Sequence, residues 1–278
     1  MRLPIANPVP LTSFPSRVSP WARTLLTGHR GACAYARENS LTSFRRAVAM
    51  GADVLECDVR LTRDGALILA HDGIVGRGRA VARIAALTEK QLRAYTPDVL
   101  TFAELLPLVM AHDVLLNVDL KVPDAEVPLV GTLAAHDLLH RTVVTSRASY
   151  QLRRLRALAP GLRLGLSKGS SPPRGPHGAP EWAALFTQRA LLPQTLPGTL
   201  RHARADAAYL HYRLVTPALI RSLHGTGYGV YVWTVDDVAV AEQLLGWGVD
   251  GITTNRPDFV RLLIDRCSTP RDDGRENR

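Results

Sequence analysis

The chain has 278 residues, of which 46% are hydrophobic and 21% charged, as is ordinary for a soluble globular protein. Its net charge of +9 comes mostly from scattered arginines. A basic surface of this kind favours phosphate-bearing substrates or anionic membranes; the alternative is a general surface property with no specific partner. The sequence has no basic run that predicts nucleic-acid binding, no stretch near the roughly 20 apolar residues of a membrane span, and too few cysteines for a disulfide framework.

The two ends of the chain differ in composition from its middle. Residues 1–23 are rich in proline and lack an apolar run of signal-peptide length, so we expect an irregular arm and a cytoplasmic location. The charged tail at 267–278 is expected to be disordered. Between them, residues 24–266 are expected to form a single catalytic domain, because strand-like and helix-like patterns alternate throughout.

About eight segments have the apolar or alternating pattern of strands, and amphipathic helical segments separate them. The strands are expected at residues 24–29, 53–60, 114–121, 142–146, 162–167, 205–212, 228–234 and 251–254. The helices are expected at residues 40–50, 101–112, 125–136, 149–158, 181–192, 217–223, 236–245 and 257–264. The remaining segments are a hairpin arm at 66–71, a less regular stretch at 73–99 with a short helix at 88–95, and a flexible Gly/Pro/Ser loop at 168–180.

This alternation predicts a (β/α)8 TIM barrel, in which the active site lies at the carboxyl ends of the strands. Several residues with chemically active side chains lie at or near these ends: His29, Asp58, His71, Lys121 and Trp233. The predicted fold and the predicted chemistry therefore agree, although they rest on different observations.

Two of the expected strands alternate between polar and apolar residues. In the second strand, Glu56 and Asp58 share one face, because strand side chains repeat every two residues. In the third, Asp119 and Lys121 share a face in the same way. Acids that point into a shared interior are costly unless they meet a cation. They are therefore expected either to form an internal salt bridge with Arg60 or Lys121, or to hold a metal beside the two histidines as acid–base partners.

Several short motifs occur in one order and spacing along the chain. They are HRG at 29–31, ENS at 38–40, GADVLECDV at 51–59, TRDG at 62–65, HD at 71–72 and GVDGITTNRPD at 248–258. With these motifs the chain resembles the glycerophosphodiester phosphodiesterase family over about residues 25–262. One departure is Arg37, which stands where the family's PENT motif has proline.

The resemblance implies a barrel of the phospholipase C-like phosphodiesterase type that binds one divalent cation. By this resemblance the metal ligands are Glu56, Asp58 and Asp119, and hard oxygen ligands of this kind suit Mg²⁺ or Ca²⁺ rather than zinc. The family usually has glutamate at the third position, two residues before a lysine. Asp119 keeps the spacing to Lys121 but has an arm that is one methylene shorter, which bears on metal identity and affinity.

The resemblance also implies roles for further residues. His29 and His71 would be the general acid and base, since imidazole titrates near neutrality, and each alone could also be structural. Arg30 and Lys121 would neutralise the phosphate. The two remaining expectations each have a structural alternative. Glu38 would be a metal ligand or a neighbour of the ligands; the alternative is an acid at a helix N-terminus. Trp233 would line the substrate pocket on its alcohol side; the alternative is an aromatic residue of the core.

The reaction implied by the family is hydrolysis of a glycerophosphodiester to an alcohol and sn-glycerol 3-phosphate. The partner would thus be a small-molecule phosphodiester, with peripheral membrane contact compatible with the basic charge and no integral membrane segment. One alternative is a phospholipase-type enzyme that acts on lysophospholipids or phosphoinositides. Another is a non-catalytic barrel that only binds a phosphodiester.

Overall fold

The computed structural model describes residues 24–77, 80–169 and 179–268. The irregular arm expected at 1–23 lies outside the described residues, as do most of the flexible loop expected at 168–180 and all but the first two residues of the tail expected at 267–278. The residues that the family resemblance assigns to the site all lie within the described parts.

Eight parallel strands in the described chain close into a barrel, which confirms the predicted TIM-barrel fold. In barrel order they are β1 (Leu25–Gly28), β2 (Val54–Leu61), β6 (Leu115–Leu120), β7 (Thr142–Ser146), β8 (Arg163–Lys168), β9 (Ala207–His211), β10 (Gly229–Trp233) and β11 (Gly251–Thr254). The ring closes where β1 pairs with both β11 and β2, with Thr27 opposite Thr253 and Val54.

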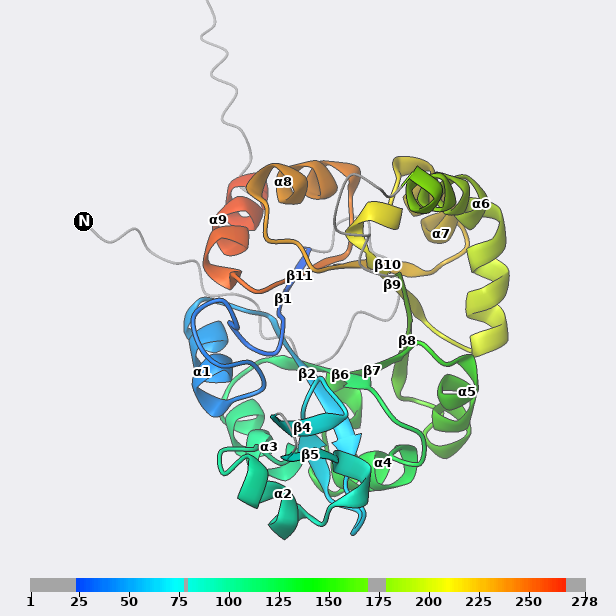
Figure 1. Cartoon of the computed structure of the whole chain (residues 1–278). Coiled ribbons are helices and arrows are strands. Elements are labelled where there is room, and N and C mark those ends of the chain that lie inside the picture. The colour runs from blue at the N-terminus through cyan, green and yellow to red at the C-terminus, as the bar shows by residue number, and fades with distance from the viewer. Residues whose placement is uncertain (1–23, 78–79, 170–178, 269–278) are drawn as a thin grey trace, which may run out of the picture.

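Helices form a ring outside the strands, as Figure 1 shows. They are α1 (Leu41–Ala49), α3 (Phe102–Ala111), α4 (Glu126–Ala135), α5 (Ser149–Leu158), α6 (Ala179–Ala203), α7 (Pro217–Gly225), α8 (Val238–Trp247) and α9 (Pro257–Ser268). The apolar faces of helices and strands meet in one continuous buried layer between the two rings. This layer is the main hydrophobic core.

Helix α6 is longer than the sequence pattern predicts. The expected helix ends at Leu192, but α6 continues to Ala203 through Pro193 and Pro197. Proline inside a helix removes a backbone hydrogen bond and normally ends it. Here Leu196 and other residues at helical spacing are buried in the core, so packing outweighs the local cost of the prolines.

The segment after β2 contains strands that the sequence did not predict. β3 (Leu67–Leu69) returns antiparallel along β2, as expected for the hairpin, but β4 (Ile74–Arg77) and β5 (Ala80–Arg83) form a separate small sheet. Helix α2 (Glu89–Tyr95) follows, near the expected position. This segment has a small core of its own, made of Ile68, Ile84, Leu92 and Val99.

The interior of the barrel toward the amino ends of the strands is filled by side chains from alternate strand positions. They are Leu25, Val54, Leu115, Val143, Ala207, Tyr209 and Tyr231. The rings of Tyr209 and Tyr231 stack with centroids 4.7 Å apart. Gly165 makes room for them, because a Cβ there would lie 2.4 Å from the Tyr209 ring. The same inward positions nearer the carboxyl ends of the strands carry polar side chains, so an apolar floor supports a polar mouth.

Candidate active site

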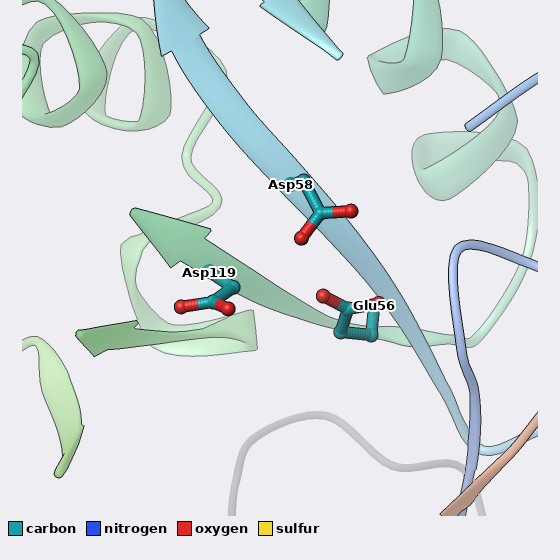
Figure 2. Close-up of side chains that lie close together, drawn as sticks. All are labelled: Glu56, Asp58 and Asp119. Atoms are coloured by element: carbon teal, nitrogen blue, oxygen red, sulfur yellow. The ribbon is translucent and has the colours of Figure 1, made fainter. Parts of the chain in front are cut away.

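Three carboxylates meet at the mouth of the barrel. Glu56 and Asp58 project from β2 and Asp119 projects from neighbouring β6, as Figure 2 shows. One oxygen of each acid lies within 4.8 Å of the others. The alternation read from the sequence is correct, since the intervening residue Cys57 points into the core between strands and helices. The barrel thus places the three predicted metal ligands at one point.

Two basic side chains touch these acids. Lys121 Nζ lies 2.9 Å from Asp58 Oδ1 and also contacts Asp119 Oδ2. Arg30 Nε lies 3.0 Å from Asp58 Oδ2, and the Arg30 backbone N–H donates to Glu56 Oε2 at 2.8 Å. The salt bridge expected with Lys121 therefore forms. The one considered with Arg60 does not, because that guanidinium donates instead to the carbonyl oxygens of residues 70 and 71.

Charge at this cluster is unevenly compensated. Burial, with Asp58 and Asp119 close by, raises the pKa of Glu56 well above its ordinary value. Burial also acts to raise the pKa of Asp58, but Lys121 and Arg30 outweigh it and hold that pKa below its ordinary value. Two side-chain cations thus leave one of three carboxylates without a partner charge. An all-oxygen donor set that needs a further positive charge fits a hard divalent cation.

The turn that carries Arg30 has an unusual backbone. Arg30 has a φ of 53° and Gly31 a φ of +86°, both in the left-handed region. A Cβ on Gly31 would lie 2.5 Å from the carbonyl carbon of Ser43, so only glycine fits. Helix α1 begins just beyond, with Ser40 as its N-cap. The turn therefore requires the glycine of the HRG motif, and it aims the Arg30 N–H at Glu56.

Glu38 lies beside the acid cluster rather than in it. Its side chain is 45% exposed, and its Oε2 lies 2.5 Å from Arg30 Nη1. The first turn of α1 contains no acidic residue, so the helix-terminus alternative does not describe Glu38. The side chain holds the far end of the guanidinium that touches Asp58.

The two histidines occupy different surroundings. His29 follows β1, is partly buried, and its Nδ1 lies 2.6 Å from Asn255 Oδ1. His71 follows β3, and the backbone N–H before it, that of Ala70, bonds to the carbonyl of Asp58 at 3.0 Å. The His71 side chain is 41% exposed, and its Nδ1 lies 2.9 Å from Asp72 Oδ1. The antiparallel return of β3 thus brings His71 back to the strand that carries two of the acids.

Trp233 ends β10 and packs against the apolar floor. It pairs in the strand ladder with His211 at the end of β9, and the two rings meet edge to face with centroids 5.2 Å apart. Burial, and then the nearby Arg213, lower the pKa of His211 to about 4. This aromatic pair forms the wall on the β9–β10 side of the barrel.

Sequence reasoning missed three polar residues near the proposed site. Asn39 donates from Nδ2 to Asp58 Oδ2 at 3.0 Å, whereas only its neighbour Glu38 was predicted to act at the site. Asn255 contacts His29, although the GVDGITTNRPD motif that contains it was interpreted only as the last strand and the helix that follows. His211 lies next to Trp233. A polar residue directly after a predicted barrel strand was the available signal for Asn255, as for His29.

Comparison with known proteins agrees with this arrangement. The sequence matches the Glycerophosphoryl diester phosphodiesterase family over residues 29–259. The chain belongs to this family. Members of the glycerophosphodiester phosphodiesterase family are phosphoric diester hydrolases, so the protein is an enzyme of that class. A curated relative, the glycerophosphodiester phosphodiesterase of Caldanaerobacter subterraneus subsp. tengcongensis, is 29% identical over 261 residues, covering 87% of this chain and 98% of its own length.

Solved structures share the family's barrel. A glycerophosphodiester phosphodiesterase from Parabacteroides distasonis has a TM-score of 0.72 at 22% identity, covering 89% of this chain and 99% of its own. An Oleispira antarctica phosphodiesterase, solved in complex with the product sn-glycerol-3-phosphate, has a TM-score of 0.70 at 22% identity, covering 87% of this chain and 97% of its own. Among the helices that the structure describes, none has both the length and the apolar character needed to cross a membrane.

Proposed function

We propose that this phosphodiesterase hydrolyses glycerophosphodiesters to an alcohol and sn-glycerol 3-phosphate with one divalent cation, Mg²⁺ or Ca²⁺. Residues 24–266 would form the single catalytic domain. The observation that carries the proposal is the cluster of three carboxylates, from β2 and β6, lying within 4.8 Å of one another beside two cationic side chains. The product bound to the Oleispira antarctica relative is the one that this reaction would yield.

Glu56, Asp58 and Asp119 would hold the cation. When bound there, it would supply positive charge to the phosphodiester and to the oxyanion that develops in the transition state. Arg30 and Lys121 already contact the same acids, so they are placed to turn toward a phosphate that arrives beside them. Arg30 and Lys121 would bind the phosphate and orient it.

His29 and His71 would move the protons. Phosphodiester cleavage needs a proton taken from the attacking oxygen and one given to the leaving oxygen. Burial, and then the adjacent Arg30, lower the pKa of His29 from its ordinary value, which favours the neutral imidazole that can take a proton. His71 is more exposed, and its Nδ1 lies 2.9 Å from Asp72 Oδ1, so it would give the second proton to the leaving oxygen at the open side of the site.

Substrate assays with defined metals test the proposal. Glycerophosphocholine, glycerophosphoethanolamine and a lysophospholipid should be compared after chelation and after return of Mg²⁺ or Ca²⁺. We expect turnover of the two glycerophosphodiesters only with metal. Faster turnover of the lysophospholipid would favour the phospholipase-type reading, for which the exposed Ile74 and Val81 of the β4–β5 sheet offer an apolar contact. Binding without turnover of any of the three would indicate a non-catalytic barrel.

A further inference from the structure

We infer that Asn255 and Asp236 are positioning residues that hold His29 in one tautomer, with the proton on Nδ1 and the lone pair of Nε2 free to accept a proton. The inference rests on the proposed role of His29 in proton transfer. It adds two residues, from the loops after β10 and β11, to the functional site.

A chain of short contacts joins the three side chains. His29 Nδ1 lies 2.6 Å from Asn255 Oδ1, and Asn255 Nδ2 lies 2.5 Å from Asp236 Oδ2. Within residues 24–77, 80–169 and 179–268, no group hydrogen-bonds to the other ring nitrogen of His29. The imidazole is thus held from one side only.

The chemistry of the three groups fixes the direction of these bonds. An ionised carboxylate only accepts hydrogen bonds, so the amide NH₂ of Asn255 must face Asp236. Its carbonyl oxygen, Oδ1, must then face His29. Because that oxygen also only accepts, Nδ1 must carry the proton. In a neutral imidazole this leaves Nε2 unprotonated.

Asp236, the last of these three side chains, is held in place by further hydrogen bonds. Asp236 Oδ1 accepts from the hydroxyl of Thr254 at 2.9 Å and from the backbone N–H of Asn255 at 2.8 Å. These two residues stand at the end of β11, and the His29 backbone N–H bonds to the Thr254 carbonyl at 2.9 Å. The parallel pairing of β1 with β11 therefore sets both ends of the His29–Asn255 contact.

This arrangement determines the step that His29 performs. The proton of the attacking hydroxyl passes to Nε2, the oxygen keeps the electron pair for attack on phosphorus, and the imidazolium that forms keeps its Nδ1–H bond to Asn255. The charged groups that act on His29 are Arg30, which opposes its protonation, and Asp58 and Asp236, which favour it. The group that contacts the His29 ring is the Asn255 amide, which has a dipole but no net charge. It therefore fixes the orientation of the ring without placing a full negative charge beside it.

The first test compares Asn255→Ala, Asn255→Asp and His29→Ala with the wild-type enzyme, with Mg²⁺ and glycerophosphocholine. We expect Asn255→Ala to lower kcat by about 10- to 100-fold, less than loss of the imidazole itself, with KM changed little. Asn255→Asp keeps an acceptor for Nδ1–H but replaces the NH₂ that faces Asp236 by a carboxylate oxygen, so it should recover only part of kcat. Its added carboxylate should shift the acidic limb of the pH–rate profile upward. Cys33→Ala is the matched control, because it removes the other side-chain donor to the same Oδ1, at 2.7 Å, and leaves the Asn255–Asp236 and His29–Asn255 contacts in place.

A second test reads the tautomer directly and does not depend on activity. Long-range ¹H–¹⁵N spectra of the imidazoles, with the His29 signals identified from His29→Ala, should show Nδ1–H in the wild type and in Cys33→Ala. They should show a mixture of tautomers in Asn255→Ala and in Asp236→Asn, where the amide of residue 236 no longer orients Asn255. An unchanged Nδ1–H tautomer in Asn255→Ala would overturn the inference.

The double variant His29→Ala/Asn255→Ala separates positioning from a general structural role. If Asn255 acts only through His29, the double variant should be no slower than His29→Ala alone. Additive losses would overturn the inference. Full activity of His29→Ala would instead overturn the proposed role of His29, a failure that the kinetics of that single variant identify by themselves.

Discussion

Asp58 and Asp119 stand directly opposite each other in the parallel ladder between β2 and β6. Neighbouring strands lie about 4.8 Å apart, so two inward acids in register are forced into proximity. Like charges at this distance repel, and Lys121 between them offsets only part of the charge. The register of these two strands thus creates the need for a cation at the site.

The first prediction concerns the metal. Exhaustive chelation should abolish activity, and Mg²⁺ or Ca²⁺ should restore it. Asp58→Asn should weaken cation affinity by more than about 10-fold, because it removes one of three charged ligands. Asp119→Glu, which restores the longer arm usual in the family, should tighten it. Calorimetric titration measures both variants without substrate, and full activity in the chelated enzyme would refute metal dependence.

The second prediction concerns the histidines. His29→Ala and His71→Ala should each reduce kcat by about 10²- to 10⁴-fold, the usual contribution of one general acid or base. Neither side chain belongs to the buried core, so circular dichroism and cation affinity should match those of the wild type. Near-normal turnover in either variant would show that its histidine has no part in proton transfer.

The third prediction concerns stability and pH. Burial, and then Arg213, hold the pKa of folded His211 at about 4, against an ordinary value of 6.5. Between these values the unfolded state binds more protons than the folded state, so the free energy of unfolding should fall as pH drops from 6.5 toward 4. Urea denaturation across this range should show a shallower pH dependence in His211→Gln. Identical slopes for wild type and variant would contradict this account.

The fourth prediction concerns the nucleophile. No Ser, Cys or Thr in the motifs has a recognisable nucleophile context, while the two histidines suffice to activate a hydroxyl of the substrate. Glycerophosphocholine should therefore be cleaved much faster than its 2-deoxy analogue, which has the same leaving group. Comparable rates would point to direct attack by water, and the cyclic phosphate intermediate expected from internal attack would be ruled out.

The fifth prediction concerns the floor beneath the site. Gly165→Ala should lower the free energy of unfolding by about 1–3 kcal/mol, because the new Cβ would lie 2.4 Å from the Tyr209 ring and 2.8 Å from Thr145 Cγ2. Gly131→Ala in α4 is the matched control. Its Cβ would meet nothing within 4 Å, so it should raise stability by up to about 1 kcal/mol. Urea denaturation measures both, and equal effects would refute the packing argument.

Local patterns in the sequence determined the barrel and the acid cluster. The period of two in the second and third strands placed Glu56, Asp58 and Asp119 on inward faces, because side-chain direction in a strand depends only on parity. The expected strands at 24–29 and 228–234 placed His29 and Trp233 at or near strand ends, because the apolar pattern that marks each strand is itself local. These features needed no knowledge of distant contacts.

Only the tertiary structure decided the features that depend on partners far along the chain. Helix α6 continues through two prolines because its leucines pack on the core, and β4 pairs with β5 across a stretch whose glycines weaken the strand signal. Asn255 reaches His29 across 226 positions because β1 and β11 close the barrel. Asparagine after a strand is equally typical of a turn, so its functional contact follows from strand pairing and not from its own sequence context.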